Sequence, residues 1–195
     1  MIEAKTVYFE NPGIENTDQT LHLAKDRAQQ VGIKTVLVAS TTGRTAVKAI
    51  EVFKGIRLII VRTSTGFKQP NVQEFTEERM KIMQSNNIPV ITAAHAFGGL
   101  SRSMRQGDII RAPATYVVGD IIASTLRIFG QGMKVACEIS VMAADAGVVR
   151  NDEEVIAIAG VGQTGGVDTA IVVKAEPAHH FFDFKVKEVI CKPRL

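Results

Sequence analysis

The sequence predicts an α/β fold, a three-layer α/β/α sandwich whose sheet is mostly parallel with an antiparallel strand near the C-terminal end. Several short runs are apolar almost throughout: residues 35–39, 57–61, 88–93 and 154–159. Strands that lack inside–outside alternation are buried on both faces, as in parallel sheets covered by helices. Helical patterns separate these runs, whereas the last run is followed by a glycine-rich loop and another strand, 169–174, which indicates a mixed sheet.

The first helix is expected to begin near residue 17, because Asn16 or Thr17 can cap it. Gly32 follows at the position where a left-handed residue commonly ends a helix. Between these ends, apolar residues recur at steps of three and four along one face: Leu21, Ala24, Ala28 and Val31.

Two further helices are expected before the middle of the chain. The second runs from about residue 43 to 53 and ends at Gly55, with its inward residues being Ala46, Val47, Ile50 and Phe53. The third begins after Pro70, where Asn71 caps it and Glu74 completes a capping box. Its apolar stripe consists of Val72, Phe75, Ile82 and Met83.

Two more helical patterns, around residues 119–129 and 132–146, meet at the break Gly130-Gln131-Gly132. The second has apolar residues on several sides, which is typical of a helix that lies centrally or at a contact between subunits. We therefore expect a homo-oligomer, a symmetric dimer or larger. Residues 185–190 partly alternate, with charges on one face, as in a final or edge strand.

Composition excludes several classes of protein. With 195 residues, 46% of them hydrophobic, the chain is expected to form one domain over residues 1–195 and is neither disordered nor collagen-like. Cys137 and Cys191 lie far apart and are expected to be free thiols in a reducing compartment. The cations are scattered and no apolar stretch is long enough to span a bilayer, so we expect a cytoplasmic protein with neither nucleic-acid nor membrane partners.

The clearest candidate site follows the strand at residues 35–39. Ligands of open α/β sheets bind beyond the carboxyl ends of the strands, where helix N-termini collect. The loop Ser40-Thr41-Thr42-Gly43-Arg44-Thr45 offers hydroxyl groups, the free N–H groups of a first helical turn and a cation, which together suit a phosphate. The alternative is an ordinary helix cap at Thr42, with Arg44 in solvent.

Three more strand ends carry unusual loops. Residues 63–68 repeat the hydroxyl, glycine and cation, and this loop is expected to lie beside the first. Residues 93–99 include His95, a candidate for ligand contact or proton transfer but not for metal binding, and Phe97, which could stack on a flat ring. Residues 160–168 hold more glycines than a turn needs, so their backbone is expected to approach either a ligand or a neighbouring loop.

Other candidates have simpler explanations. His179 and His180 are expected in a surface loop. Glu138 is either a buried functional carboxylate or the partner of Lys134 in an ion pair on one helix, which is the simpler interpretation. The residues expected to contact a ligand are therefore Ser40, Thr41, Thr42, Gly43, Arg44, Thr45, Thr63, Thr65, Gly66, Phe67, His95, Phe97, Gly98, Thr164, Gly165 and Gly166.

Two segments resemble the C-terminal α/β domain of pyruvate kinase. Residues 34–63, KTVLVASTTGRTAVKAIEVFKGIRLIIVRT, are similar to its strand, Thr/Ser-Gly-Arg-Ser/Thr loop, helix and following strand. Residues 154–173, EVIAIAGVGQTGGVDTAIVV, resemble its last pair of strands around a Gly/Ser-rich loop. The whole chain looks like the stand-alone, mainly prokaryotic proteins of the pyruvate kinase α/β-domain-like family.

The resemblance implies a phosphate-bearing ligand. In many pyruvate kinases this domain carries the allosteric sugar-phosphate site, and its Thr/Ser-Gly-Arg loop binds the phosphate. The resemblance implies the same role for residues 41–45, with Gly165 and Gly166 in the loop that faces them. The resemblance to the stand-alone proteins implies flavin mononucleotide (FMN) as a ligand. Its ring would lie beside Phe67, His95, Phe97 and Gly98. Residues 64–150 have no clear counterpart, and there is no room for the catalytic barrel, so no pyruvate kinase activity is expected.

Three classes of function compete, with FMN as the leading ligand and a sugar phosphate as the second. A flavoenzyme would use His95 as its proton-transfer group. A ligand sensor or storage protein would need only tight binding. An oligomeric interaction module without catalysis would use residues 117–147 as its interface.

Overall fold

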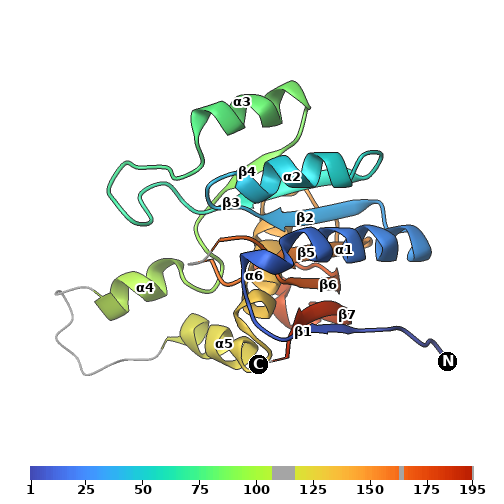
Figure 1. Cartoon of the computed structure of the whole chain (residues 1–195). Helices are drawn as coiled ribbons and strands as arrows, with labels where there is room; N and C mark the ends of the chain where they lie inside the picture. The colour runs from blue at the N-terminus through green and yellow to red at the C-terminus, as the bar shows by residue number, and fades with distance from the viewer. Residues whose placement is uncertain (107–116, 163–164, 195) are drawn as a thin grey trace.

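Seven strands lie side by side in one sheet, in the order β1-β7-β6-β5-β2-β3-β4 (Figure 1). The computed structural model describes residues 1–106, 117–162 and 165–194. The strands are β1 (Val7–Phe9), β2 (Thr35–Ala39), β3 (Arg57–Arg62), β4 (Val90–Thr92), β5 (Glu154–Ala159), β6 (Thr169–Lys174) and β7 (Lys185–Pro193).

The sheet is mostly parallel, as predicted. β2 pairs in parallel with β5 and β3, β3 with β4, and β1 with β7. β6 is antiparallel to both β5 and β7, which confirms the antiparallel strand near the C-terminal end. β7 is the last strand but not an edge strand, because β1 pairs with it, Val7 opposite Cys191. The three residues of β1 are too few to give a strand signal in the sequence.

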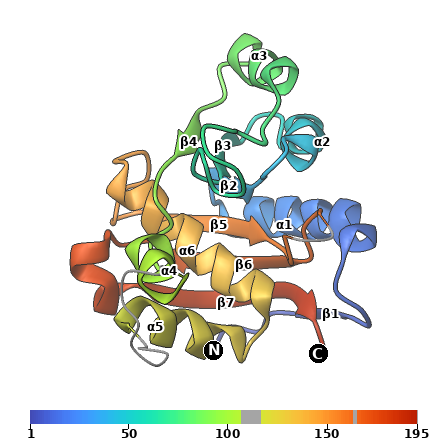
Figure 2. The same ribbon diagram turned by 90° about the vertical axis from the view of Figure 1, so that its left-hand side faces the viewer.

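Helices cover both faces of this sheet (Figures 1 and 2). One face packs against α1 (Thr17–Val31), α2 (Arg44–Val52) and α3 (Glu77–Ser85). The other packs against α5 (Val118–Arg127) and α6 (Gln131–Asp145), and α4 (Gly99–Gln106) contacts α5. Two short 3-10 helices are η1 (Ile14–Asn16) and η2 (Ala178–Asp183). Within the described part of the chain, no helix has both the length and the apolar character needed to cross a membrane.

Alternate residues of each strand enter two separate cores. Val36 and Val38 of β2 pack in the core beneath α1 and α2, whereas Leu37 packs in the core beneath α6. All three are fully buried, which is why the run at residues 35–39 is apolar at every position after Thr35. α6 is buried on most of its surface, so the expectation that it is central is met.

The expected start of the third helix is wrong. α3 begins at Glu77, and its cap is Thr76, whose hydroxyl accepts a hydrogen bond from the Arg79 N–H (3.4 Å). Asn71 instead has a left-handed φ of 62° in the preceding loop, and Glu74 forms an ion pair with a lysine of that loop. A turn whose polar side chains bond within it therefore replaces the first helical turn that the sequence suggested.

Smaller differences concern residues expected to be inward or capping. Val31 is 42% exposed because it is the last residue of α1, and Val72 is 45% exposed because it precedes α3. Asn16 precedes α1, yet its side chain donates to the Asn11 carbonyl instead of capping. The Thr17 hydroxyl accepts a hydrogen bond from the distant Val167 N–H, which ties α1 to the start of β6.

Candidate functional site

The carboxyl ends of β2, β3, β4 and β5 lie at one edge of the sheet. In the order of the sheet, the chain leaves β2 through α2 toward β3, which lies on one side of the β2–β5 pair. It leaves β5 toward β6, which lies on the opposite side of that pair. The adjacent strands β2 and β5 therefore form a topological switch point, the place where ligands of open α/β sheets bind. The loops at residues 40–45 and 160–166 stand at this point.

The loop after β2 presents helix N–H groups toward the edge. The Ser40 hydroxyl accepts from the Ala46 N–H (3.2 Å), and the Gly43 carbonyl accepts from the Val47 N–H (3.1 Å). Among the described residues, the N–H groups of Arg44 and Thr45 meet no acceptor. Two donors of the first turn of α2 are therefore available, and the helix dipole favours an anion there.

One side of this loop is covered by α3 and the segment before it. The Arg79 guanidinium donates from Nη1 to the Thr42 carbonyl (2.8 Å). A Cβ atom added at Gly43, whose φ is 88°, would lie 2.8 Å from Arg79 Cδ and 3.0 Å from Phe75 Cζ. Gly43 thus permits close packing against protein. Arg79 brings a second guanidinium to the loop, and nothing in its local sequence indicated this.

The glycine-rich loop after β5 faces Arg44. A Cβ at Gly165 would lie 3.2 Å from Arg44 Nη2, so the structure brings these two predicted residues together. A Cβ at Gly166 would lie 2.3 Å from Thr17 Oγ1 and 2.7 Å from Ile14 Cα. Of the two explanations offered by the sequence, a neighbouring segment of protein accounts for Gly166. Thr164 lies outside the described residues.

Asp168, at the end of this loop, bonds to protein. Its carboxylate accepts from the Gly13 N–H (3.2 Å) and the Thr169 hydroxyl (2.8 Å). Burial raises the pKa of Asp168, and these two hydrogen bonds oppose that rise. The Gly13 N–H and the Thr169 hydroxyl therefore hold the Asp168 carboxylate within the protein.

The loop at residues 63–68 follows the neighbouring strand β3, as expected, but it folds on itself. The Gln73 side-chain amide donates to the Thr63 carbonyl (3.0 Å) and to the Thr65 hydroxyl (3.3 Å). Gly66, with φ of 80°, donates to the Val72 carbonyl (2.9 Å). Within the described chain, the buried Thr63 hydroxyl has no hydrogen-bond partner.

The aromatic residues expected to flank a ligand contact each other. The rings of Phe67 and His95 stack, with centroids 4.8 Å apart and 19° between their planes, and the Arg102 guanidinium lies 4.4 Å from the Phe67 ring centroid. Phe97 is 4% exposed and packs edge-on against Phe181. Phe97 is therefore a core residue and does not present its ring to a ligand. Phe67 and His95 remain as the expected rings that lie near the surface. Gly98 donates to the His95 carbonyl (3.3 Å).

A buried ion pair lies beneath His95. Lys134 donates to Glu138 Oε2, and the side chains are 7% and 3% exposed. Glu138 Oε1 accepts from the Phe97 N–H (3.1 Å), and Oε2 lies 3.9 Å from His95 Nδ1. Burial lowers the pKa of both His95 and Lys134. The ion pair of Glu138 with Lys134 is present as expected, and it is buried under a loop at the edge of the sheet.

The remaining candidates lie apart from this edge. His180 is 66% exposed on η2, beside His179, as expected for a surface segment. The described residues contain no cluster of three or more His, Cys, Asp or Glu side chains that could hold a metal ion.

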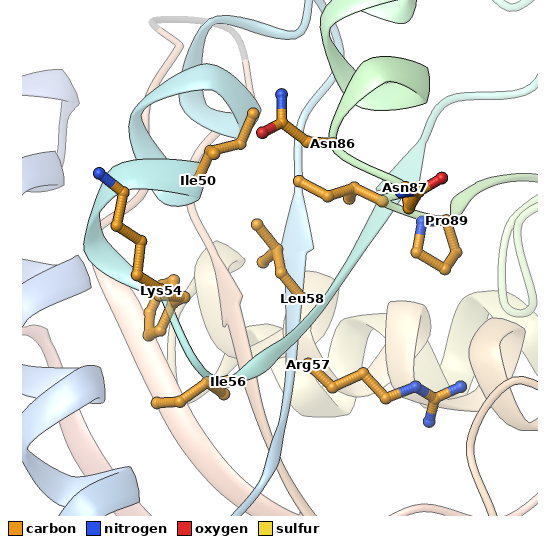
Figure 3. A pocket seen from close by; sticks show the side chains of 10 residues that line it. Ile50, Lys54, Ile56, Arg57, Leu58, Asn86, Asn87 and Pro89 are labelled. Atoms are coloured by element: carbon orange, nitrogen blue, oxygen red, sulfur yellow. The ribbon is translucent and has the colours of Figure 1, made fainter.

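A hollow of about 370 Å³ lies at the opposite edge, where β3 and β4 begin (Figure 3). Ile50, Leu58 and other apolar side chains line it, while the charged ends of Lys54 and Arg57 point away. Its other polar lining residues, Asn86 and Asn87, carry no charge.

Residues 18–173 match the protein-family model that is described as pyruvate kinase, alpha/beta domain. The matched segment runs from α1 into β6 and contains all four loops at the carboxyl edge of the sheet.

Proposed function

Because the chain belongs to the pyruvate kinase alpha/beta domain family, we propose that it binds a phosphate-bearing small molecule at the carboxyl ends of its strands. The observation that carries this proposal is the pairing of loops at the switch point. Two helix N–H groups without acceptors among the described residues lie in the loop that carries Arg44, and Arg44 faces Gly165. The proposal assigns no pyruvate kinase reaction to these residues.

The binding groups differ in what they would contribute. The N–H groups of Arg44 and Thr45 would donate to phosphate oxygens, with the hydroxyls of Thr41 and Thr42 beside them. The exposed Arg44 guanidinium would add a charge-assisted contact. Arg79, held on the Thr42 carbonyl, would strengthen the positive potential of the loop.

FMN is the first ligand to test and a sugar phosphate the second. The donors at residues 41–45 suit the phosphate of either molecule. An isoalloxazine ring inserted between Phe67 and His95 would require these rings to separate, because they stack on each other. A sugar phosphate needs no such opening, and this is the observation that favours it.

The visible spectrum of the purified protein, with mass spectrometry of any small molecule released on denaturation, tests the flavin. Titration calorimetry with FMN, ribose 5-phosphate and inorganic phosphate then compares the ligands. A colourless protein that takes up no added FMN would eliminate FMN as the ligand. If neither FMN nor ribose 5-phosphate releases or absorbs heat on titration, the proposal of a phosphate site is eliminated. A flavin-bound protein would then be assayed for turnover with a reductant and an acceptor, which separates an enzyme from a sensor or storage protein.

The Arg44→Ala variant tests the location of the site. A charge-assisted hydrogen bond contributes about 1.5–3 kcal/mol, so the loss of the guanidinium should weaken binding of the phosphate ester roughly tenfold to a hundredfold. Lys48→Ala is the matched control, because Lys48 is an exposed cation on the same helix whose ammonium pairs with Asp18. Equal affinities of the wild type and the Arg44→Ala variant would place the ligand elsewhere.

A further inference from the structure

α6 carries two charged side chains into an otherwise apolar core. The side chains of Lys134 and Glu138 are 7% and 3% exposed, and around them α6 contributes Met133, Ala136, Cys137 and Ile139. Removing an ion pair from water is unfavourable, and apolar residues of similar volume often stabilise a core at least as well. The presence of the Lys134–Glu138 ion pair is therefore not explained by its contribution to the stability of α6.

The pair is connected to the edge of the sheet by His95. Glu138 uses one carboxylate oxygen to accept from the Phe97 N–H, which fixes the loop after β4 above it. The other oxygen bonds to Lys134 and lies 3.9 Å from Nδ1 of His95. The His95 side chain is 18% exposed, whereas the carboxylate beneath it is 3% exposed. The imidazole is thus the member of this group that an incoming molecule can reach.

We propose that His95 and Glu138 form an acid–base dyad, with Lys134 as the counter-charge of the carboxylate. Nδ1 faces Glu138, so Nε2 is the nitrogen available to a ligand. Carboxylate–histidine pairs of this kind orient the imidazole and stabilise the imidazolium that forms when it accepts a proton. The separation of 3.9 Å needs to shorten by about 1 Å to become a hydrogen bond, and catalytic contacts often tighten only when a ligand is bound.

The reaction step would be a proton transfer. Nε2 of the neutral imidazole accepts the proton of an acidic C–H or O–H group on the ligand, and the electron pair of the broken bond stays on the ligand. The imidazolium is then held by the carboxylate, and it returns the proton in the second half of the reaction. No oxidant or reductant is needed for this exchange.

The burial of His95 favours a neutral imidazole before the transfer. Burial lowers the pKa of His95, Glu138 raises it, and Lys134 and Arg102 lower it. Glu138 and Lys134 lie on α6, Arg102 lies on α4, and the Phe67 ring covers the imidazole from the loop after β3. His95 is therefore able to accept a proton near neutral pH.

Histidine titration by NMR tests the coupling, with the His95 signal assigned by its loss in His95→Asn. Glu138→Gln keeps an acceptor for the Phe97 N–H and removes the negative charge, so the pKa of His95 should fall by about one unit or more. Lys134→Met combined with Glu138→Gln removes both charges and should return the pKa toward the wild-type value. The signals of His22, His179 and His180 serve as internal controls. An unchanged His95 titration in Glu138→Gln would reduce Glu138 to a tether and overturn the dyad.

Chemical modification tests whether Nε2 is reachable. Diethyl pyrocarbonate acylates neutral imidazoles, and mass spectrometry of peptides follows each histidine separately. We expect His95 to react in the wild-type protein and to react severalfold more slowly in Glu138→Gln, while His179 and His180 react equally in both. A His95 that stays unmodified while those two react would exclude contact with a ligand. Neither experiment uses a phosphate ester, so the dyad and the proposed phosphate site fail separately.

Discussion

Glycines at the edge of the sheet differ in what their missing side chain permits. Gly162 and Gly166 lie in the same loop and have nearly the same left-handed φ, 74° and 73°. Among the described residues, a Cβ at Gly162 would meet no atom within 4 Å, whereas one at Gly166 would overlap Thr17 and Ile14. The sequence indicated a close approach somewhere in this loop, and the structure identifies α1 and η1 as the partners.

The two glycines form a matched pair for a stability measurement. Gly162→Ala should lower the free energy of unfolding by about 1 kcal/mol, because alanine is strained at this φ. Gly166→Ala carries the same strain and adds overpacking, so it should lower that free energy by a further ~1–3 kcal/mol. Urea unfolding of both variants checks this, and equal midpoints would contradict the packing seen at Gly166.

At the scale of elements, the strands were easier to predict than the helix ends. The runs at 35–39 and 154–159 coincide with β2 and β5, because burial on both faces favours apolar residues at nearly every position. The start of α3 was wrong, because Asn71 and Thr76 both lie before helical patterns and local spacing cannot distinguish them. The segment between these two residues is held to the loop after β3 by hydrogen bonds of Gln73 and an ion pair of Glu74, and sequence spacing does not predict these contacts.

The N-terminus of α3 allows a test of its cap. Thr76→Ala removes the hydroxyl that accepts from the Arg79 N–H and should lower the free energy of unfolding by about 0.5–1 kcal/mol, since the bond is long. Thr76→Ser retains the hydroxyl and should lower it by less. Thermal or urea unfolding of the two variants separates these outcomes, and identical losses would mean that the cap contributes nothing.

At the scale of the whole molecule, the two helices expected at a subunit contact have different surroundings. α6 is buried within its own chain, whereas α5 and the two residues that follow it expose four apolar side chains, between 55% and 76% each: Val118, Ile121, Ile128 and Phe129. Leu100 of α4 is also 85% exposed. Within residues 117–147, the surface that could form the expected interface is therefore the exposed side of α5, and not α6.

We predict that α5 pairs with a second copy of the chain, because a symmetric contact would remove the same apolar side chains from water in both copies. Light scattering after gel filtration should give the mass of a dimer or larger for the wild type, and a smaller mass for Ile121→Glu combined with Ile128→Glu. Gln84→Glu, an added charge on the exposed side of α3, is the control. A monomeric wild type would exclude this contact.

The sequence by itself determined the class of fold, the buried strands and the loops at their carboxyl ends, because those features depend on residues that are neighbours in the chain. It did not determine which loop groups are packed against protein, as at Gly166, or already bonded to it, as at Asp168 and Phe97. Nor did it bring Glu138 under His95: the Phe97 N–H that bonds to Glu138 is 41 residues away along the chain. Only the folding of α6 across the sheet puts a buried carboxylate next to that histidine, since long-range contacts depend on how elements pack and not on local periodicity.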